Sequence, residues 1–208
     1  MIKLHGIAAS RAFRPLWVLE ELGLAHEHIP QDFRDGTLRN PEYLKLNPNG
    51  RIPTLQDDDL TLWESMAINL YLASKYDKKT LLWPNAIALQ GLIYQWSFWV
   101  VSEVEHKLFS VLLHRRLHTK INRDAACADR NEIALQAPFA ILEQALNSSD
   151  YLLGNQFTLA DLNVASVLSW APLSRISLKA YPNLAAWLKR CLARPARKRA
   201  QVDKASLT

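Results

Sequence analysis

Residues 47–65, NPNGRIPTLQDDDLTLWES, decide the fold of this 208-residue chain. Residues 54–56 and 60–63 are two short apolar segments, and an acidic turn separates them. Such a pair of segments predicts an antiparallel β-hairpin. Pro53 stands directly before the first segment and disfavours the helical conformation of Ile52, which we expect to be extended. The stretch therefore predicts a hairpin whose entry leaves backbone groups available to a peptide ligand.

The residues on both sides of the hairpin predict an α/β unit. Residues 2–5 alternate as a strand does, and Pro30 within a second short strand indicates an edge position. Gly23 is a helix-ending residue, and Ser65 is suited to cap the helix after the hairpin. The helical segments are 14–22, 41–46 and the residues after Ser65. We expect a βαβαββα domain over residues 1–77.

After residue 77 the strand signals stop, and residues 78–85 resemble a linker. Four segments then show helical spacing: 86–118, 124–147, 158–171 and 183–193. Thr158 and Asp161 form a variant of the capping box, which is a folding device. We expect an all-helical domain over residues 86–208 that shares a cleft with the first domain.

The composition bounds the class of protein. An apolar fraction of 49% with 22% charged residues is typical of globular domains, and no apolar block indicates a signal peptide or a membrane span. Two isolated cysteines do not form a disulfide framework. We therefore expect a cytoplasmic protein. The last twenty residues contain seven Lys and Arg and one acidic residue. This basic run is either a solvated helix end or a surface that binds nucleic acid or a membrane, and we favour the helix end.

Four motifs together resemble the cytosolic glutathione S-transferase family. They are residues 8–10 (AAS), 47–53 (NPNGRIP), 62–65 (LWES) and 157–161 (FTLAD). The alanine–serine pair is most similar to serine-type members of the plant-type and bacterial branches. The resemblance implies a thioredoxin-like amino-terminal domain, an all-helical carboxy-terminal domain, a homodimer and glutathione as co-substrate.

The resemblance places the catalytic role on Ser10. A free thiol has a pKa near 8.5 and is mostly protonated at neutral pH, so a site that uses glutathione as a nucleophile must stabilise the thiolate. Ser10 precedes a helix start, where backbone N–H groups and the dipole favour an anion, and its hydroxyl can donate to sulfur. Arg11 or Arg14 could add a charge. From the residues alone, Ser10 as a simple helix cap is the alternative.

The resemblance also places the glutathione-binding residues. Ile52 would pair with the tripeptide backbone as an added strand, and the family implies a cis Ile52–Pro53 bond. Glu64 would bind the ammonium group, and Ser65 the carboxylate of the γ-glutamyl group. Related plant-type sequences place His-Lys where this chain has Leu38-Arg39, so we expect Arg39, assisted by Arg51, to bind the glycine carboxylate.

Candidates for the electrophile site are Ile7, Phe13, Trp99 and Glu103. Trp96, Trp99 and Val100 share one helix face, which more often belongs to a core. Glu103 with His106 lacks the second copy that a di-iron site needs, and His114 with His118 lacks a third ligand. We expect no metal.

We therefore predict an enzyme that conjugates glutathione to small apolar electrophiles, with no nucleic-acid or membrane partner. A second possibility is glutathione-dependent thiol–disulfide exchange, although neither cysteine falls at position 10. A non-catalytic ligand-binding or partner-binding protein of the same fold is the alternative from another class.

Overall fold

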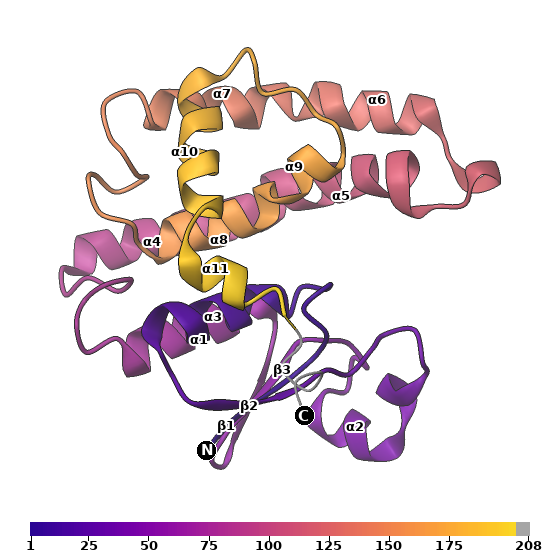
Figure 1. Cartoon of the computed structure of the whole chain (residues 1–208), viewed down its shortest axis with the longest axis vertical. Coiled ribbons are helices and arrows are strands. Elements are labelled where there is room, and N and C mark those ends of the chain that lie inside the picture. Colours follow the sequence, from indigo (N-terminus) through magenta and orange to yellow (C-terminus); the bar gives the residue numbers. More distant parts are fainter. Residues whose placement is uncertain (203–208) are drawn as a thin grey trace. The chain divides into compact units, whose positions relative to one another are not determined.

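The computed structural model describes residues 1–202, which fold as two compact units (Figure 1). The first unit contains Met1–Trp83 together with the segment that begins at Ala193. The second unit contains Pro84–Leu192. The predicted domain of residues 86–208 differs from this division at its carboxyl end, because the last helix packs with the first unit.

A four-stranded sheet in the order β2-β1-β3-β4 is the centre of the first unit. Its strands are β1 (Ile2–His5), β2 (His26–Ile29), β3 (Thr54–Asp57) and β4 (Leu60–Trp63). β1 pairs with β2 in parallel and with β3 in antiparallel orientation, and β3 and β4 form the predicted hairpin. The predicted edge strand β2 ends at Ile29, directly before Pro30, which cannot donate to a strand ladder.

Helices complete the first unit in the predicted order: α1 (Phe13–Leu22), the 3₁₀ turn η1 (Thr37–Arg39), α2 (Pro41–Leu46) and α3 (Ser65–Tyr76). Gly23 ends α1 with φ 64°, a conformation that a side chain disfavours. α1 packs against α3 (Figure 1). The buried side chains of this layer include Leu16, Trp17, Val18, Leu19, Ile68 and Leu72.

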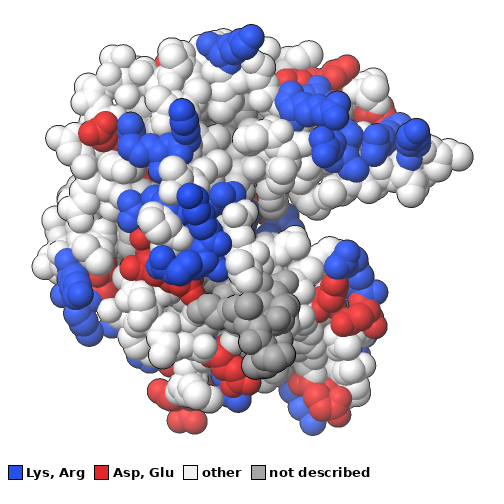
Figure 2. All heavy atoms as spheres, viewed as in Figure 1, with Lys and Arg blue, Asp and Glu red and all other residues white. Residues whose placement is uncertain are grey.

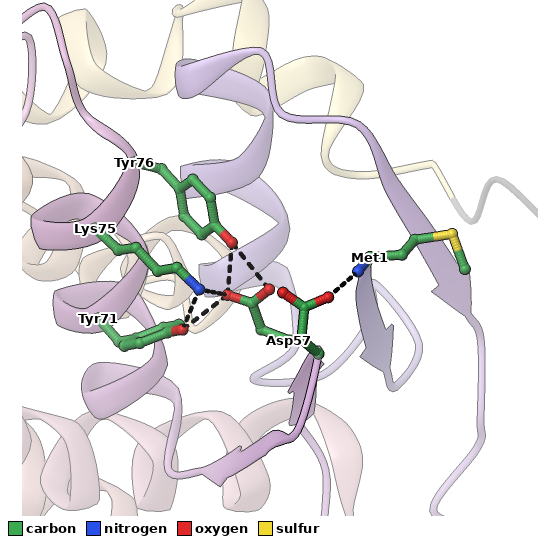
Figure 3. A network of polar contacts seen from close by, with 6 residues as sticks. Met1, Asp57, Tyr71, Lys75 and Tyr76 are labelled. Atoms are coloured by element: carbon green, nitrogen blue, oxygen red, sulfur yellow. Dashed lines mark hydrogen bonds and ion pairs between the residues drawn. The ribbon is translucent and has the colours of Figure 1, made fainter.

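A polar network fastens the end of β3 to α3 (Figure 3). Asp57 accepts from Lys75 Nζ at 2.8 Å, from the Tyr71 hydroxyl at 2.8 Å and from the Tyr76 hydroxyl at 2.7 Å. The three donors follow one another on the last two turns of α3. Three directional bonds therefore fix the register of α3 against the sheet.

The short helix α11 (Pro195–Arg199) packs on α1, within the first unit. Arg194 makes a two-pronged ion pair with Glu21, at 2.6 and 2.8 Å. Arg199 pairs with Glu20 at 2.7 Å, and the Arg197 guanidinium lies 5.9 Å from the centre of the Phe13 ring. The basic run thus includes a short helix, as the favoured interpretation expected, but Arg194 and Arg199 are paired with acidic residues of α1 rather than simply solvated.

The second unit is helical throughout the described residues. Its elements are α4 (Ile87–Trp99), the π-helical η2 (Val100–Glu105), α5 (His106–Leu112), the π-helical η3 (Leu113–Leu117), the 3₁₀ turn η4 (Lys120–Asn122), α6 (Ala125–Ala134), α7 (Gln136–Ala145), α8 (Leu159–Leu168), α9 (Trp170–Leu173) and α10 (Pro182–Leu192). The four predicted helical segments are present, but each of the first three is divided. None of the helices in residues 1–202 combines the length and the apolarity that crossing a bilayer requires.

The helix α8 is the core of the second unit, because every one of its residues is buried. The predicted capping box is present at its start: Asp161 accepts from the Thr158 N–H at 2.9 Å. The same carboxylate accepts from Leu152 N–H at 2.8 Å and from the Trp187 indole at 2.9 Å. Asp161 therefore joins α10 and the loop before α8 to the cap.

Candidate functional site

Ser10 lies in the turn that leads from β1 into α1. Its hydroxyl accepts a hydrogen bond from Ala12 N–H at 3.1 Å and donates to the Ile7 carbonyl at 2.7 Å. Ser10 is not the N-cap of α1, since that position belongs to Ala12. The Ala12 N–H polarises the hydroxyl, and rotation about the Cβ–Oγ bond can redirect its proton from Ile7 to a ligand without loss of that bond.

Gly6 allows the Ser10 turn to approach the segment before β3. Gly6 has φ 127°, and a Cβ at this position would lie 2.8 Å from the Ala12 Cβ and 3.0 Å from the Ile52 Cβ. A side chain would therefore push the two segments apart. His28 fixes the other side of the turn, because its Nε2 bonds to the Gly6 carbonyl at 2.8 Å.

The Ile52–Pro53 peptide bond is cis, as the resemblance implied. Within residues 1–202, the backbone N–H and C=O of Ile52 have no hydrogen-bond partner. The segment is half-buried, so these groups are accessible at the surface beside the Gly6 turn. The prediction of an unpaired strand entry thus agrees with the geometry.

Two buried side chains that the sequence analysis did not single out hold this segment. The Tyr43 hydroxyl donates to the Arg51 carbonyl at 2.6 Å and lies 2.8 Å from Thr54 Oγ1. The Asn47 amide donates to the same carbonyl at 2.8 Å. Burial raises the pKa of Tyr43, although the bond with Thr54 acts in the opposite direction, and the hydroxyl stays neutral. The N-P-N-G motif was a signal for Asn47, because asparagine commonly bonds to nearby backbone in turns.

Arg39 packs against the turn of residues 47–51. Its Nη1 lies 3.5 Å from the Asn49 carbonyl, and a Cβ on Gly50 would approach that nitrogen to 2.8 Å. Gly50 has φ 57° and no side chain, so the guanidinium can lie on this turn. Arg39 and Arg51 are both exposed, and the structure places Arg39 beside the backbone that carries Arg51.

Glu64 and Ser65 join β4 to α3. Glu64 has φ 72° and ψ 111°, a conformation that costs a residue with a Cβ about 1–3 kcal/mol and that is concentrated at functional sites. The predicted helix cap at Ser65 is wrong: Glu64 occupies the N-cap position, and Ser65 is the first helical residue. Ser65 instead accepts from Arg14 Nη1 at 3.1 Å, and both side chains are buried.

This contact gives Arg14 a position that the sequence left open. Arg14 is 2% exposed and reaches from α1 to the start of α3, whereas Arg11 is exposed at the surface. The guanidinium therefore places positive charge beside Ser65 at the start of α3. No sequence signal could identify this pair, because 51 residues separate its members.

The candidates for the electrophile site divide between the two units. Ile7 and Phe13 are mostly buried in the first unit. In the second unit, Trp96 is buried and meets Trp99 in an edge-to-face contact at 5.1 Å. Trp99 is half-buried, and Glu103 is exposed with Lys107 3.4 Å away. Trp96 therefore belongs to the core, and Trp99 and Glu103 keep accessible surface.

Histidine pairs do not build a metal centre in the described part of the chain. His114 and His118 meet edge to face at 5.0 Å between ring centres, and His114 Nδ1 accepts from Asp124 N–H at 3.1 Å. Residues 1–202 contain no cluster of three or more His, Cys, Asp and Glu that could ligate a metal ion.

Two family models match the chain. The model "Glutathione S-transferase, N-terminal domain" matches residues 1–74, and "Glutathione S-transferase, C-terminal domain" matches residues 94–195. Glutathione S-transferase 3 of Zea mays is 35% identical over 94% of this chain and 90% of the maize protein. The boundaries of the two matches fall on either side of the helix start of α4.

Solved structures agree with this similarity. The theta class glutathione S-transferase of Xanthomonas axonopodis pv. citri, with glutathione bound, has a TM-score of 0.89 and 32% identity, with 97% of each chain covered. Ure2p in complex with glutathione has a TM-score of 0.85 and 30% identity, with 96% of this chain and 92% of that chain covered.

Proposed function

Because this chain belongs to the glutathione S-transferase family, we propose that it conjugates glutathione to small apolar electrophiles and that Ser10 stabilises the attacking thiolate. The observation that carries the proposal is the Ser10 hydroxyl, which receives the Ala12 N–H and can donate its own proton. This arrangement needs no base, since its task is to lower the pKa of the ligand's thiol.

The chemistry follows from the field at the start of α1. A hydroxyl donor and a helix start together stabilise an anion by about 2–3 kcal/mol, which lowers a thiol pKa by about two units. The released proton goes to solvent. The sulfur lone pair then forms a bond to the electrophilic carbon, and the leaving group departs with the bonding pair or the added electrons are protonated.

The tripeptide would lie across the segments that carry Ile52 and Glu64. The free Ile52 backbone groups pair with the cysteinyl residue, as an added strand does. Glu64 takes the ammonium group, and Ser65, supported by Arg14, takes the γ-glutamyl carboxylate. Arg39 and Arg51 are the cations for the glycine carboxylate.

The first test is Ser10→Ala, assayed with 1-chloro-2,4-dinitrobenzene. We expect kcat to fall about a hundredfold, because the thiolate loses its hydroxyl donor while the helix start remains, and glutathione affinity by calorimetry should change little. Ser10→Thr keeps the hydroxyl and is the matched control. Full activity in Ser10→Ala would remove Ser10 from the mechanism.

A second candidate is a protein that binds glutathione without conjugating it, and the similar structure of Ure2p in complex with glutathione supports the binding part of this candidate. Calorimetry and turnover separate the two: tight glutathione binding without turnover on any of several electrophiles favours the second candidate. Absence of both favours a scaffold. Thiol–disulfide exchange has less support, because position 10 carries a serine and both cysteines, Cys127 and Cys191, belong to the second unit.

A homodimer and a cytoplasmic location also remain proposals. An exposed apolar stripe on α4 supports the homodimer: Ile87, Tyr94 and Phe98 are 83%, 43% and 62% exposed, and their spacing places them on one side of the helix. Such a stripe on an ordered helix indicates a protein contact. Light scattering should give twice the chain mass, and Phe98→Asp should reduce it.

A further inference from the structure

The end of the α5–α6 hairpin exposes two aliphatic side chains. We define this tip as residues 113–123, which contain η3 and η4. Ile121 is 91% exposed and Leu117 is 61% exposed. Ile121 has the most exposed large apolar side chain in residues 1–202, so water contacts almost its whole surface.

The same tip is basic. Residues 113–123 contain four Lys and Arg and no Asp or Glu. Arg116 and Lys120 are exposed, and neither has an acidic partner within residues 1–202. Arg115, by contrast, is paired with Glu132 and with Asp129 at 3.2 Å. Three of the four tip cations, Arg116, Lys120 and Arg123, therefore have no acidic partner within residues 1–202. Figure 2 shows Lys and Arg gathered near this end of the hairpin.

Hydrogen bonds give the tip a defined conformation. The Arg123 guanidinium donates to the carbonyls of His118 at 3.0 Å and of Arg116 at 3.1 Å. Asp124 N–H donates to His114 Nδ1 at 3.1 Å. Arg123 makes these bonds to neutral carbonyls and thus keeps its charge. Leu117, Ile121 and the neighbouring cations therefore lie on a turn with a defined conformation.

We propose that this tip docks on the surface of an anionic lipid bilayer. Leu117 and Ile121 would enter the headgroup region, while Arg116, Lys120 and Arg123 contact lipid phosphates. Exposed aliphatic residues surrounded by cations are the elements of interfacial binding, since the apolar side chains gain from burial and the cations are attracted to the negative surface. The contact concerns the bilayer surface only, and it departs from our sequence-based expectation of no membrane partner.

Nucleic acid fits this tip less well. Proteins that bind single strands stack bases on aromatic side chains, and the chain has no Phe, Tyr or Trp between Phe109 and Phe139. A backbone-only contact would use the cations but would leave Ile121 in water. The almost fully exposed isoleucine is the feature that distinguishes the two partners.

The test is co-sedimentation of the full chain with vesicles. We expect binding to mixed phosphatidylserine–phosphatidylcholine vesicles that decreases with salt, and little binding to phosphatidylcholine alone. Ile121→Ser and Lys120→Glu should each weaken binding about tenfold. Neither side chain is buried, so both variants should melt as the wild-type protein does.

Two matched controls lie elsewhere in the second unit. Ile133 is 64% exposed on α6, and Lys189 is exposed on α10. Ile133→Ser and Lys189→Glu should bind vesicles as the wild-type protein does. The proposal is overturned if the wild-type protein ignores anionic vesicles, if the controls lose binding equally, or if Ile121→Ser binds normally while Lys120→Glu does not. The last result would show a general polyanion surface, which tighter binding to a duplex DNA probe would confirm.

Discussion

Arg14 is a buried cation on α1 that bonds to Ser65 at the start of α3, within the proposed glutathione site. A guanidinium at 2% exposure loses most of its hydration, so its hydrogen bonds must compensate. Its bond to the Ser65 hydroxyl at 3.1 Å orients that hydroxyl and adds charge beside the position proposed for a carboxylate. Arg14 is thus a positioning residue, whose effect on a ligand passes through Ser65.

A double-mutant cycle tests this connection. We expect Arg14→Met and Ser65→Ala each to weaken glutathione binding about tenfold, because a hydrogen bond to a charged group contributes about 1.5–3 kcal/mol. The double variant should lose less than the sum, with a coupling of about 1 kcal/mol. Calorimetry gives the affinities. Strictly additive losses would show that Arg14 acts without Ser65.

For individual residues, the sequence singled out candidate site positions but did not predict which side chains contact them. Ser10, Glu64 and Ser65 were proposed from local motifs, and the structure shows that Glu64 has the positive φ of a constrained position. The helix-cap role of Ser65 was wrong, and its contact with Arg14 could not be predicted because 51 residues separate the two. Gly6 was not singled out from the sequence, although it permits the approach of Ile52.

Between residue and domain, the turn from α2 to β3 is the element that shapes the strand entry. Tyr43 and Asn47 both donate to the Arg51 carbonyl, one residue before Ile52. Two buried side chains of the first unit therefore fix the backbone next to Ile52, whose own N–H and C=O have no partner within residues 1–202. Ligand pairing should depend on this support even though neither residue needs to touch the ligand.

Removal of the Tyr43 hydroxyl should weaken glutathione binding and leave the rate of the chemical step nearly unchanged. For Tyr43→Phe we expect the free energy of unfolding to fall by about 1–2 kcal/mol, since a buried hydrogen bond is lost. KM for glutathione should rise several-fold with kcat nearly unchanged. Denaturant melts and steady-state kinetics measure the two effects. Tyr151→Phe, in the second unit, serves as the control, because its hydroxyl makes no hydrogen bond within residues 1–202, and an equal change there would show a nonspecific effect.

Prolines explain two of the helix breaks that the sequence analysis did not predict. A proline has no N–H and excludes a regular bond to the carbonyl four residues earlier. The carbonyl four residues before Pro138 is that of Ala134, where α6 ends. The carbonyl four residues before Pro172 is that of Leu168, where α8 ends. These breaks were readable from the sequence. The π-helical segments η2 and η3 were not, because apolar periodicity does not distinguish one helical hydrogen-bond pattern from another.

For the molecule as a whole, the Asp57 network makes stability depend on pH. Burial acts to raise the pKa of Asp57, but the hydrogen bonds from Lys75, Tyr76 and Tyr71 together outweigh it, and the pKa lies below its ordinary value. The hydrogen bond with Asp57 likewise raises the pKa of Lys75. Since the folded pKa of Asp57 is lowered, its contribution is present above the unfolded pKa near 4 and is lost as the pH falls through the folded pKa.

Asp57→Asn should show this dependence. At pH 7 we expect the variant to be less stable by about 1–2 kcal/mol, because the charged acceptor is replaced by a neutral one. The difference should shrink as the pH falls below about 4, where the wild-type carboxylate also becomes protonated. Denaturant unfolding at several pH values measures it. Asp59→Asn, at the exposed hairpin turn, is the control, and a difference that is constant with pH would contradict the assignment.

The two-part organisation was predicted correctly as a thioredoxin-like unit and a helical unit. The hairpin, the edge position of β2 and the order of the elements along the chain follow from local patterns, which is why they could be predicted. The return of α11 to the first unit could not, since its ion pair of Arg194 with Glu21 joins positions 173 residues apart. The sequence shows that this segment is basic, but it does not show which helix the segment packs against.

This return has a consequence for synthesis of the chain. Residues 1–83 leave the ribosome before the second unit does, yet the segment that pairs with Glu20 and Glu21 on α1 is translated only after the whole second unit. Domains generally fold in order from the amino terminus as they emerge. Here the first unit must wait, with part of α1 uncovered, until the second unit has been made. A nascent chain that stalls before residue 193 would therefore carry an incomplete first unit and offer its uncovered surface to chaperones.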